Sequence, residues 1–167
     1  MNLNDILTEK NWEKAVIKPA VSGGAYKTSL ISKNEAGNQE TFEALIKEND
    51  VLIQKFIDEI KDGEWSLIFF NKKYSHSALK VPKADDFRVQ HEFGGKYIYK
   101  EAPAGSIQQA QKIVESVKDE LLYARVDGIF INNVFYLMEL ELIEPDLFLD
   151  GADAKENFMK AILEALK

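Results

Sequence analysis

The sequence predicts an α+β fold in which a small N-terminal part precedes a larger antiparallel sheet flanked by helices. Short apolar runs of strand length alternate with segments of helical periodicity along the whole chain. No internal repeat, low-complexity segment or long polar linker separates them. A turn signal at Asp62-Gly63 divides the chain, so we expect one subdomain at 1–62 and a second at 63–167.

The composition is that of a globular protein of one ordinary domain or two small ones. The 167 residues are 46% hydrophobic and 29% charged, and the lack of cysteine excludes disulfides, thiol catalysis and Cys-ligated zinc. A net charge of -7 disfavours nucleic acid as a partner. No apolar run approaches the ~20 residues that cross a bilayer, and the N-terminus lacks the regions of a signal peptide. We therefore expect a cytoplasmic protein with no membrane partner.

In the first part, strands surround a glycine loop. Pro19 ends the first strand, the pair Gly23-Gly24 indicates a turn, and Phe42 and Leu45 lie at helical spacing. The expected elements, in order, are a strand at 14–18, the loop at 20–25, a strand at 27–32, a short helix at 42–46 and a buried-looking apolar run at 51–57.

The second part is richer in strands. Gly94-Gly95 interrupts two strand pieces. This pair indicates a bend or bulge at which the backbone lies close to another group. Apolar residues from Ile107 to Leu121, and again from Phe158 to Leu166, follow the period of an amphipathic helix. Between and around these helices we expect strands at 64–70, 73–80, 87–91, 96–100, 122–131 and 135–141.

The last two strands carry a group of acids. Glu139 and Glu141 share one face of a strand that is otherwise apolar on both sides. Ionised carboxylates in such a place need a partner or a cation, because burying them alone costs several kcal/mol. The preceding strand offers Arg125 and Asp127, again two residues apart and so on one face.

The turn between these strands decides whether the acids meet. A three-residue connection, Asn132 to Val134, sets Asp127 opposite Glu139 and gathers three carboxylates. A two-residue Asn132-Asn133 turn moves Asp127 to the other face, unless a bulge at Gly128 restores the phase. Three oxygen ligands without Cys or His suit Mg²⁺ or Mn²⁺. The alternative to a metal site is a network of ion pairs centred on Arg125, in which the acids are structural.

Four segments, taken in order, resemble the ATP-grasp superfamily of carboxylate-amine ligases. The resemblance is to the branch with bacterial glutathione synthetase, ribosomal-protein glutamate ligases and the D-cycloserine-forming ligase. The segments are VIKPAVSGGAY, VLIQKFIDEI, DFRVQHEFGG and RVDGIFINNVFYLMELELIEP. The match runs from about Ala15 to the C-terminus. It implies the ATP-grasp fold, a small glycine-loop subdomain and a larger antiparallel sheet, without the N-terminal pre-ATP-grasp domain that relatives carry.

The resemblance also implies a nucleotide site. Lys18 and the amides of the glycine loop would hold the phosphates. The backbone of residues 55–57 would contact adenine, and a following acid, Asp58 or Glu59, would approach ribose. Lys80, at a strand end, is a further phosphate candidate, with an exposed solubilising lysine as the alternative. The implied nucleotide-binding residues are Lys18, Ser22, Gly23, Gly24, Gln54, Lys55, Phe56, Ile57, Glu59 and Lys80.

The remaining roles concern catalysis and metal. Arg88 would contact the transferred phosphoryl group and the acyl phosphate, and Arg125 would orient the acids or touch the same group. The implied metal ligands are Asp127, Glu139 and Glu141, the last of which stands where many relatives have Asn. His76 and His91 lack the spacing of metal ligands, and His91 is the better candidate for a substrate contact because it follows Arg88.

Together these expectations describe a Mg²⁺-ATP-dependent ligase that acts on a small amino-acid-like carboxylate through an acyl phosphate. Two other classes of function stay open. The chain can be a nucleotide-binding module that does not turn over alone, because its substrate domain is absent. It can also be an α+β interaction domain whose acidic residues are structural. Nothing in the sequence predicts the oligomeric state.

Overall fold

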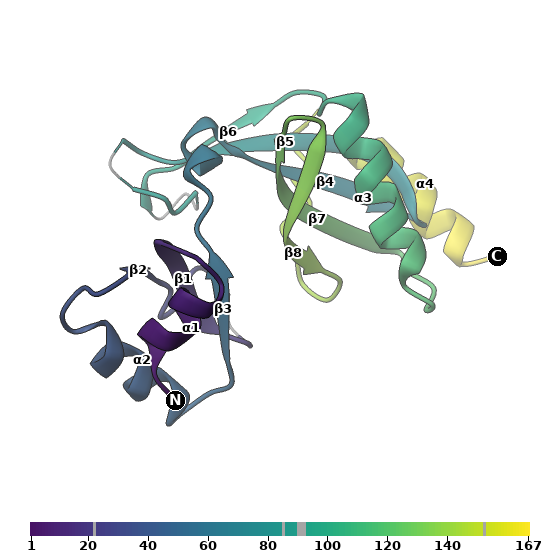
Figure 1. The fold of residues 1–167 in the computed structure, drawn as a ribbon. Helices are drawn as coiled ribbons and strands as arrows, with labels where there is room; N and C mark the ends of the chain where they lie inside the picture. Colours follow the sequence, from purple (N-terminus) through teal and green to yellow (C-terminus); the bar gives the residue numbers. More distant parts are fainter. Residues whose placement is uncertain (22, 85, 90–92, 152) are drawn as a thin grey trace. The chain divides into compact units, whose positions relative to one another are not determined.

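The computed structural model describes residues 1–167 except 22, 85, 90–92 and 152. The described residues form helices and antiparallel strands in an α+β arrangement (Figure 1). The elements are α1 Leu3–Glu9, β1 Lys14–Pro19, β2 Ser29–Ser32, α2 Asn38–Ile46, β3 Val51–Lys55, the 3-10 helix η1 Asp58–Asp62, β4 Glu64–Phe70, β5 Lys73–Val81, β6 Lys96–Tyr99, α3 Ala104–Ser116, β7 Tyr123–Ile131, β8 Val134–Glu141 and α4 Ala154–Ala165.

The chain divides into two compact units, residues 1–58 and 59–167. The first unit is built on a three-stranded antiparallel sheet of order β2-β1-β3. Alternate residues of β1, Ala15 and Ile17, are buried against apolar side chains of α1 and α2 such as Leu7 and Phe42. The other face of the same sheet carries Lys18 and neighbouring side chains of intermediate or high exposure.

The second unit is built on a five-stranded antiparallel sheet of order β6-β5-β4-β7-β8. One face of this sheet packs against α3, because Trp65, Leu67 and Phe69 of β4 form a core with Ala110 and Val114 of the helix. The turn at Asp62-Gly63 leads into this sheet and lies inside the second unit.

The opposite face of the five-stranded sheet is apolar at one end and polar at the other. Toward the apolar end, Ile68 and Phe70 of β4 pack with Phe148 and with Ala161 of α4. Toward the polar end, the same alternation of β4 brings Glu64 and Ser66 to this face. Because β4 is buried along its whole length, these two polar side chains must find partners inside the protein.

Three expected elements differ from the structure. Residues 51–55 of the apolar run at 51–57 form the edge strand β3, in which Leu52 is 48% exposed, so the interpretation of the run as buried was wrong. Residues 87–89, the described part of the expected strand at 87–91, form no strand, because the backbone N–H of Arg88 donates to Asp86 instead of to a neighbouring strand. The helix expected to reach Leu121 ends at Ser116. The short helix α1 had no counterpart among the expected elements.

None of the helices in the described part of the chain combines the length and the apolar character needed to cross a membrane.

Candidate functional site

The β7–β8 hairpin positions the acidic residues through a tight turn and a bulge. Asn132 and Asn133 both have positive φ, 50° and 65°, as a two-residue type I′ turn requires, and Ile131 pairs with Val134. Of the two alternatives that the sequence left open, the three-residue connection is therefore not the one observed. The register then shifts next to Gly128, which restores the phase, as the second alternative required.

The bulge depends on a glycine at position 128. Gly128 pairs with Leu137 whereas Asp127 pairs with Glu139, so Met138 is the extra residue of β8. A Cβ atom on Gly128 would lie 2.4 Å from Phe135 Cζ and 2.6 Å from the backbone oxygen of Tyr136. No side chain fits there without moving the hairpin. The glycine thus permits a register in which Phe135 enters the core beneath α3 while the acids face the other way.

The three predicted metal ligands converge. Asp127, Glu139 and Glu141 each offer a carboxylate oxygen, and these oxygens lie within 4.8 Å of one another. Asp127 is fully buried, Glu141 is partly buried and Glu139 is exposed. Hard oxygen ligands on rigid strands, open to solvent on one side, are the donor set that Mg²⁺ and Mn²⁺ prefer. The donor set therefore fits a divalent cation.

The ion-pair network that the sequence left as an alternative is present as well. Arg125 Nε donates to both oxygens of Asp127 at 3.1 Å, and its Nη2 donates to Glu141. Lys80 Nζ lies 2.9 Å from Asp127 Oδ2 and 2.5 Å from Glu64 Oε1. The acids therefore both converge and are partly compensated by two basic side chains.

Glu64 and Ser66 belong to this cluster, and the sequence analysis did not identify them. Ser66 Oγ donates to Asp127 Oδ1 at 2.7 Å, and Ser66 is opposite Asp127 in the β4–β7 register. Glu64 is opposite Lys80 in the β4–β5 register. The available signal was their spacing, because two polar residues at alternate positions of an otherwise apolar strand share one face.

The position of Lys80 excludes one of its two predicted roles. Its side chain is 7% exposed, so it is not a solubilising surface lysine. Burial alone lowers the pKa of Lys80, but the charges of Glu64 and Asp127 outweigh burial and raise that pKa above its ordinary value. Lys80 is therefore a permanent cation inside the cluster.

The same charges act on the acids. Burial raises the pKa of Asp127, but Lys80 and Arg125 overcome that effect and the pKa is lowered. Burial raises the pKa of Glu141, and the attraction of Arg125 offsets only part of the increase. Four carboxylates, Glu64 included, face two basic groups, so the ionised cluster carries two net negative charges that one divalent cation neutralises.

The predicted nucleotide-binding residues up to position 57 all lie in the first unit. Lys18 and Gln54 belong to the same face of its sheet, because Val16 pairs with Gln54 and Lys18 with Leu52. Lys55 ends β3, and Phe56 and Ile57 follow it. Ser22 lies outside the described residues. Around Gly23 and Gly24 an added Cβ would meet no atom within 4 Å, and Gly24 has a φ of 59°. These glycines therefore lie in an open loop and not in a crowded one.

Arg88 lies in the segment between β5 and β6. Its Nη2 is 2.8 Å from Asp86 Oδ2, and its guanidinium carbon is 3.7 Å from the centroid of the Phe93 ring. The hydrogen bonds from Arg88 lower the pKa of Asp86 to about 2. The planar guanidinium is thus fixed between a carboxylate and a ring. His91 lies outside the described residues.

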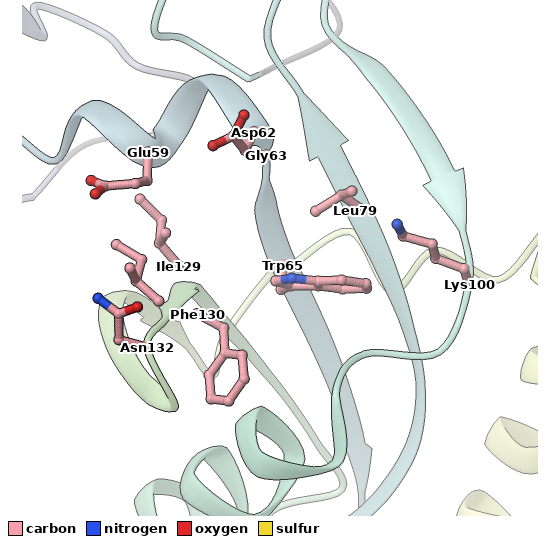
Figure 2. Close-up of a pocket in the computed structure, with 10 residues that line it drawn as sticks. Glu59, Asp62, Gly63, Trp65, Leu79, Lys100, Ile129, Phe130 and Asn132 are labelled. Atoms are coloured by element: carbon pink, nitrogen blue, oxygen red, sulfur yellow. The ribbon is translucent and has the colours of Figure 1, made fainter.

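Glu59 is placed away from the carboxylates. It borders a pocket of about 360 Å³ whose walls include Trp65, Leu79 and Phe130, with Lys100 reaching over the Trp65 ring (Figure 2). Trp65 and Leu79 pair across β4 and β5 on the face that packs against α3. The pocket therefore opens on the side of the sheet opposite the acidic cluster.

Comparison with known proteins gives the family. The model of the prokaryotic glutathione synthetase ATP-grasp domain matches residues 2–147. A glutathione synthetase of Prochlorococcus marinus is 27% identical over 110 residues, 65% of this chain and 36% of that protein. A D-alanine--D-alanine ligase of Pseudothermotoga lettingae is 30% identical over 137 residues, 77% of this chain and 46% of that protein.

Solved structures share the fold. D-cycloserine synthetase DcsG superimposes with a TM-score of 0.81 at 22% identity, over 98% of this chain and 59% of that one. D-alanine--D-alanine ligase from Bacillus anthracis, complexed with ATP, gives 0.69 at 19% identity over 98% and 55%. The chain thus spans less than two thirds of each of these relatives. The α+β architecture is the ATP-grasp fold, and the chain belongs to the family of the prokaryotic glutathione synthetase ATP-grasp domain.

Proposed function

We propose that this chain is the ATP-binding catalytic portion of a Mg²⁺-dependent carboxylate-amine ligase. A substrate carboxylate oxygen attacks the γ-phosphorus of ATP, the bond to the bridging oxygen breaks and ADP leaves. An amine then attacks the acyl carbon of the acyl phosphate, and inorganic phosphate leaves. The observation that carries the proposal is the convergence of Asp127, Glu139 and Glu141 in a chain of the ATP-grasp family.

In this proposal the three carboxylates hold Mg²⁺ or Mn²⁺, which neutralises charge on the phosphates of ATP. The donor types, their spacing within 4.8 Å and the excess negative charge of the cluster support this assignment. Arg125 acts as a positioning residue, because it donates to Asp127 and Glu141 together and fixes the distance between two of the ligands.

The nucleotide is proposed to bind the first unit through the sheet face that carries Lys18. Leu30 and Leu52 on this face are 37% and 48% exposed, and apolar side chains of this kind suit the flat surface of adenine. Lys18 and the amides of the loop with Gly23 and Gly24 would hold the phosphates, with Ser22 in the same loop. The backbone of Gln54, Lys55, Phe56 and Ile57 would contact the base, and Glu59 the ribose.

Arg88 is proposed to bind the phosphoryl group in transfer. A guanidinium that is already oriented by Asp86 and Phe93 costs little further ordering when an anion arrives. Lys80 is the proposed second cation near the phosphates. The carboxylate substrate is proposed to be small and amino-acid-like, as is the D-alanine in the name of the D-alanine--D-alanine ligase. Because the reaction consumes ATP, we propose the cytoplasm as its location.

A second candidate is a nucleotide-binding module without turnover of its own. The observation that favours it is coverage, because the chain spans 36% and 46% of the two sequence relatives. The two candidates are distinguished by measuring nucleotide binding and ADP release separately, because both bind the nucleotide and only the ligase releases ADP.

The test measures both quantities on one preparation. Thermal unfolding is followed with ATP alone, Mg²⁺ alone and both, and ADP release is followed with a panel of amino acids and amines. We expect a stabilisation that needs both ATP and Mg²⁺. Glu139→Gln should abolish it, while Glu120→Gln, an exposed acid of the same unit, should not.

The outcomes divide the candidates. ADP release that depends on an added carboxylate supports the ligase. Stabilisation by Mg²⁺-ATP with no ADP release under any substrate pair supports the binding module. If millimolar ATP with Mg²⁺ leaves the unfolding temperature unchanged, both are rejected and an interaction domain with structural acids is favoured.

A further inference from the structure

Asp127 has no free hydrogen-bonding position in the structure. An ionised carboxylate accepts about four hydrogen bonds, two at each oxygen. Oδ1 receives Ser66 Oγ at 2.7 Å and Arg125 Nε at 3.1 Å. Oδ2 receives Lys80 Nζ at 2.9 Å and shares Arg125 Nε at 3.1 Å, and Arg125 Nη2 forms an ion pair with the same oxygen at 3.0 Å. A cation that takes Asp127 as a ligand must therefore displace one of these donors.

Arg125 is held too firmly to be the group that leaves. Besides Asp127, it binds Glu141 through Nη2, donates Nη1 to the carbonyl oxygen of Asp146 at 3.2 Å and lies 5.8 Å from the centre of the Phe148 ring. Ser66 is a fully buried residue of the central strand β4, with a short side chain that has little reach.

Lys80 differs from both, because it already has a second acceptor. Its ammonium lies 2.5 Å from Glu64 Oε1 while it contacts Asp127, and Glu64 is itself 8% exposed. Leaving Asp127 therefore does not leave Lys80 as an unpaired buried charge, which is the costly outcome for a buried ion pair. A four-carbon side chain also allows the ammonium a small shift without moving the strand.

We propose that Lys80 is an exchangeable counter-ion of Asp127, which it neutralises in the metal-free protein and leaves for Glu64 alone when a divalent cation binds. The proposal rests on the proposed metal site. It gives Glu64 a role as a positioning residue, because Glu64 holds Lys80 inside the cluster after the exchange. It also accounts for a buried acid and a buried lysine next to the metal ligands.

The proposal makes two substitutions act in opposite directions on metal affinity. Lys80→Met removes the competing cation and adds one net negative charge, so Mn²⁺ should bind about tenfold more tightly. Glu64→Gln removes the negative charge that can hold Lys80 away from Asp127, so Mn²⁺ should bind about tenfold more weakly. Lys73→Met, at the exposed start of the same strand, is the matched control and should leave the affinity unchanged.

The experiment is a calorimetric titration of the full chain with MnCl₂ in the absence of nucleotide, with thermal unfolding of each variant as the check on folding. If Lys80→Met does not fold, Glu64→Gln still decides, because it nearly preserves side-chain volume. Weaker or unchanged binding by Lys80→Met, tighter or unchanged binding by Glu64→Gln, or no Mn²⁺ binding by any variant overturns the proposal. Opposite shifts without ADP release would support the exchange and count against the ligase alone.

Discussion

A single buried carboxylate, Asp127, organises the polar end of the second unit. Among the described residues, Ser66 is its one neutral donor, and the hydrogen bond of 2.7 Å joins two fully buried side chains. Ser66→Ala leaves Oδ1 without this donor, so we expect a loss of roughly 1.5 to 3 kcal/mol in the free energy of unfolding, the range for hydrogen bonds to charged groups. Urea denaturation measures it. Ser116→Ala, at an exposed helix end, should change the stability little, and equal losses for both variants would contradict the argument.

Arg88 should affect turnover more than nucleotide affinity. Its proposed contact is with the phosphoryl group in transfer, where charge develops only during the reaction. Arg88→Ala should therefore lower kcat by on the order of 10² to 10³ while the ATP dissociation constant changes little. Steady-state ADP release and ATP calorimetry give the two numbers. Lys83→Ala tests a lysine of the same segment, and an unchanged kcat for Arg88→Ala would refute the assigned role.

His76 should give the protein a stability that rises with pH. Burial lowers its pKa, and the hydrogen bond between Nε2 and the carbonyl oxygen of Leu147, at 2.9 Å, does not reverse the shift. Between the lowered value and the ordinary value of about 6.5, the unfolded chain binds more protons than the folded one. The free energy of unfolding should therefore fall as pH is lowered from 7 toward 5. His76→Gln should flatten this dependence in urea titrations, and an unchanged dependence in this variant would contradict the argument.

At the scale of elements, the bulge in the β7–β8 hairpin sets the geometry of the acids. Gly128→Ala would force a methyl group to within 2.4 Å of the Phe135 ring and 2.6 Å of a carbonyl oxygen. We expect a loss of roughly 1 to 3 kcal/mol in stability, as for other overpacked sites, together with a loss of Mn²⁺ affinity. Gly23→Ala is the control, because nothing lies within 4 Å of its Cβ position. Retained stability and metal affinity in Gly128→Ala would show that the register survives.

The hairpin also shows how much of the acidic site can be predicted from the sequence. Spacing placed Glu139 and Glu141 on one face, and the structure confirms that they meet Asp127. The sequence did not determine the length of the turn, because a three-residue turn and a two-residue turn with a bulge both place Asp127 opposite Glu139. The choice depends on the fit between Gly128 and Phe135, and contacts between strands leave no trace in the periodicity of either strand.

Other features of the structure were not predicted from the sequence, for related reasons. The helix α1 has seven residues and buries mainly Leu3 and Leu7, too few for a recognisable period. Burial of Lys80 depends on its pairing with Glu64 across β4 and β5, and that register includes a shift at Ile68 and Phe69 that local sequence does not indicate. Patterns within one strand were therefore readable, whereas partners across strands were not.

The two units have separate hydrophobic cores. Leu3, Leu7 and Phe42 belong to the core of residues 1–58, and the cores beneath α3 and α4 lie within residues 59–167. The proposed roles divide in the same way. Lys18 and the glycine loop belong to the first unit, and every acid and base of the metal cluster belongs to the second.

This division predicts that a fragment of residues 59–167 keeps metal binding and loses nucleotide binding. Its five-stranded sheet retains every strand pairing and both of its cores, so it should unfold cooperatively on heating. Its Mn²⁺ dissociation constant should stay within about threefold of that of the full chain, less than 1 kcal/mol. Its ATP affinity should fall by at least about tenfold, because the proposed contacts of Lys18 and the glycine loop are gone. Calorimetry with each ligand makes the comparison, with Lys18→Ala in the full chain as the control for the nucleotide.

A fragment that binds ATP as tightly as the full chain would show that residues 1–58 do not hold the nucleotide. A folded fragment that fails to bind Mn²⁺ would instead show that the first unit contributes to the metal site.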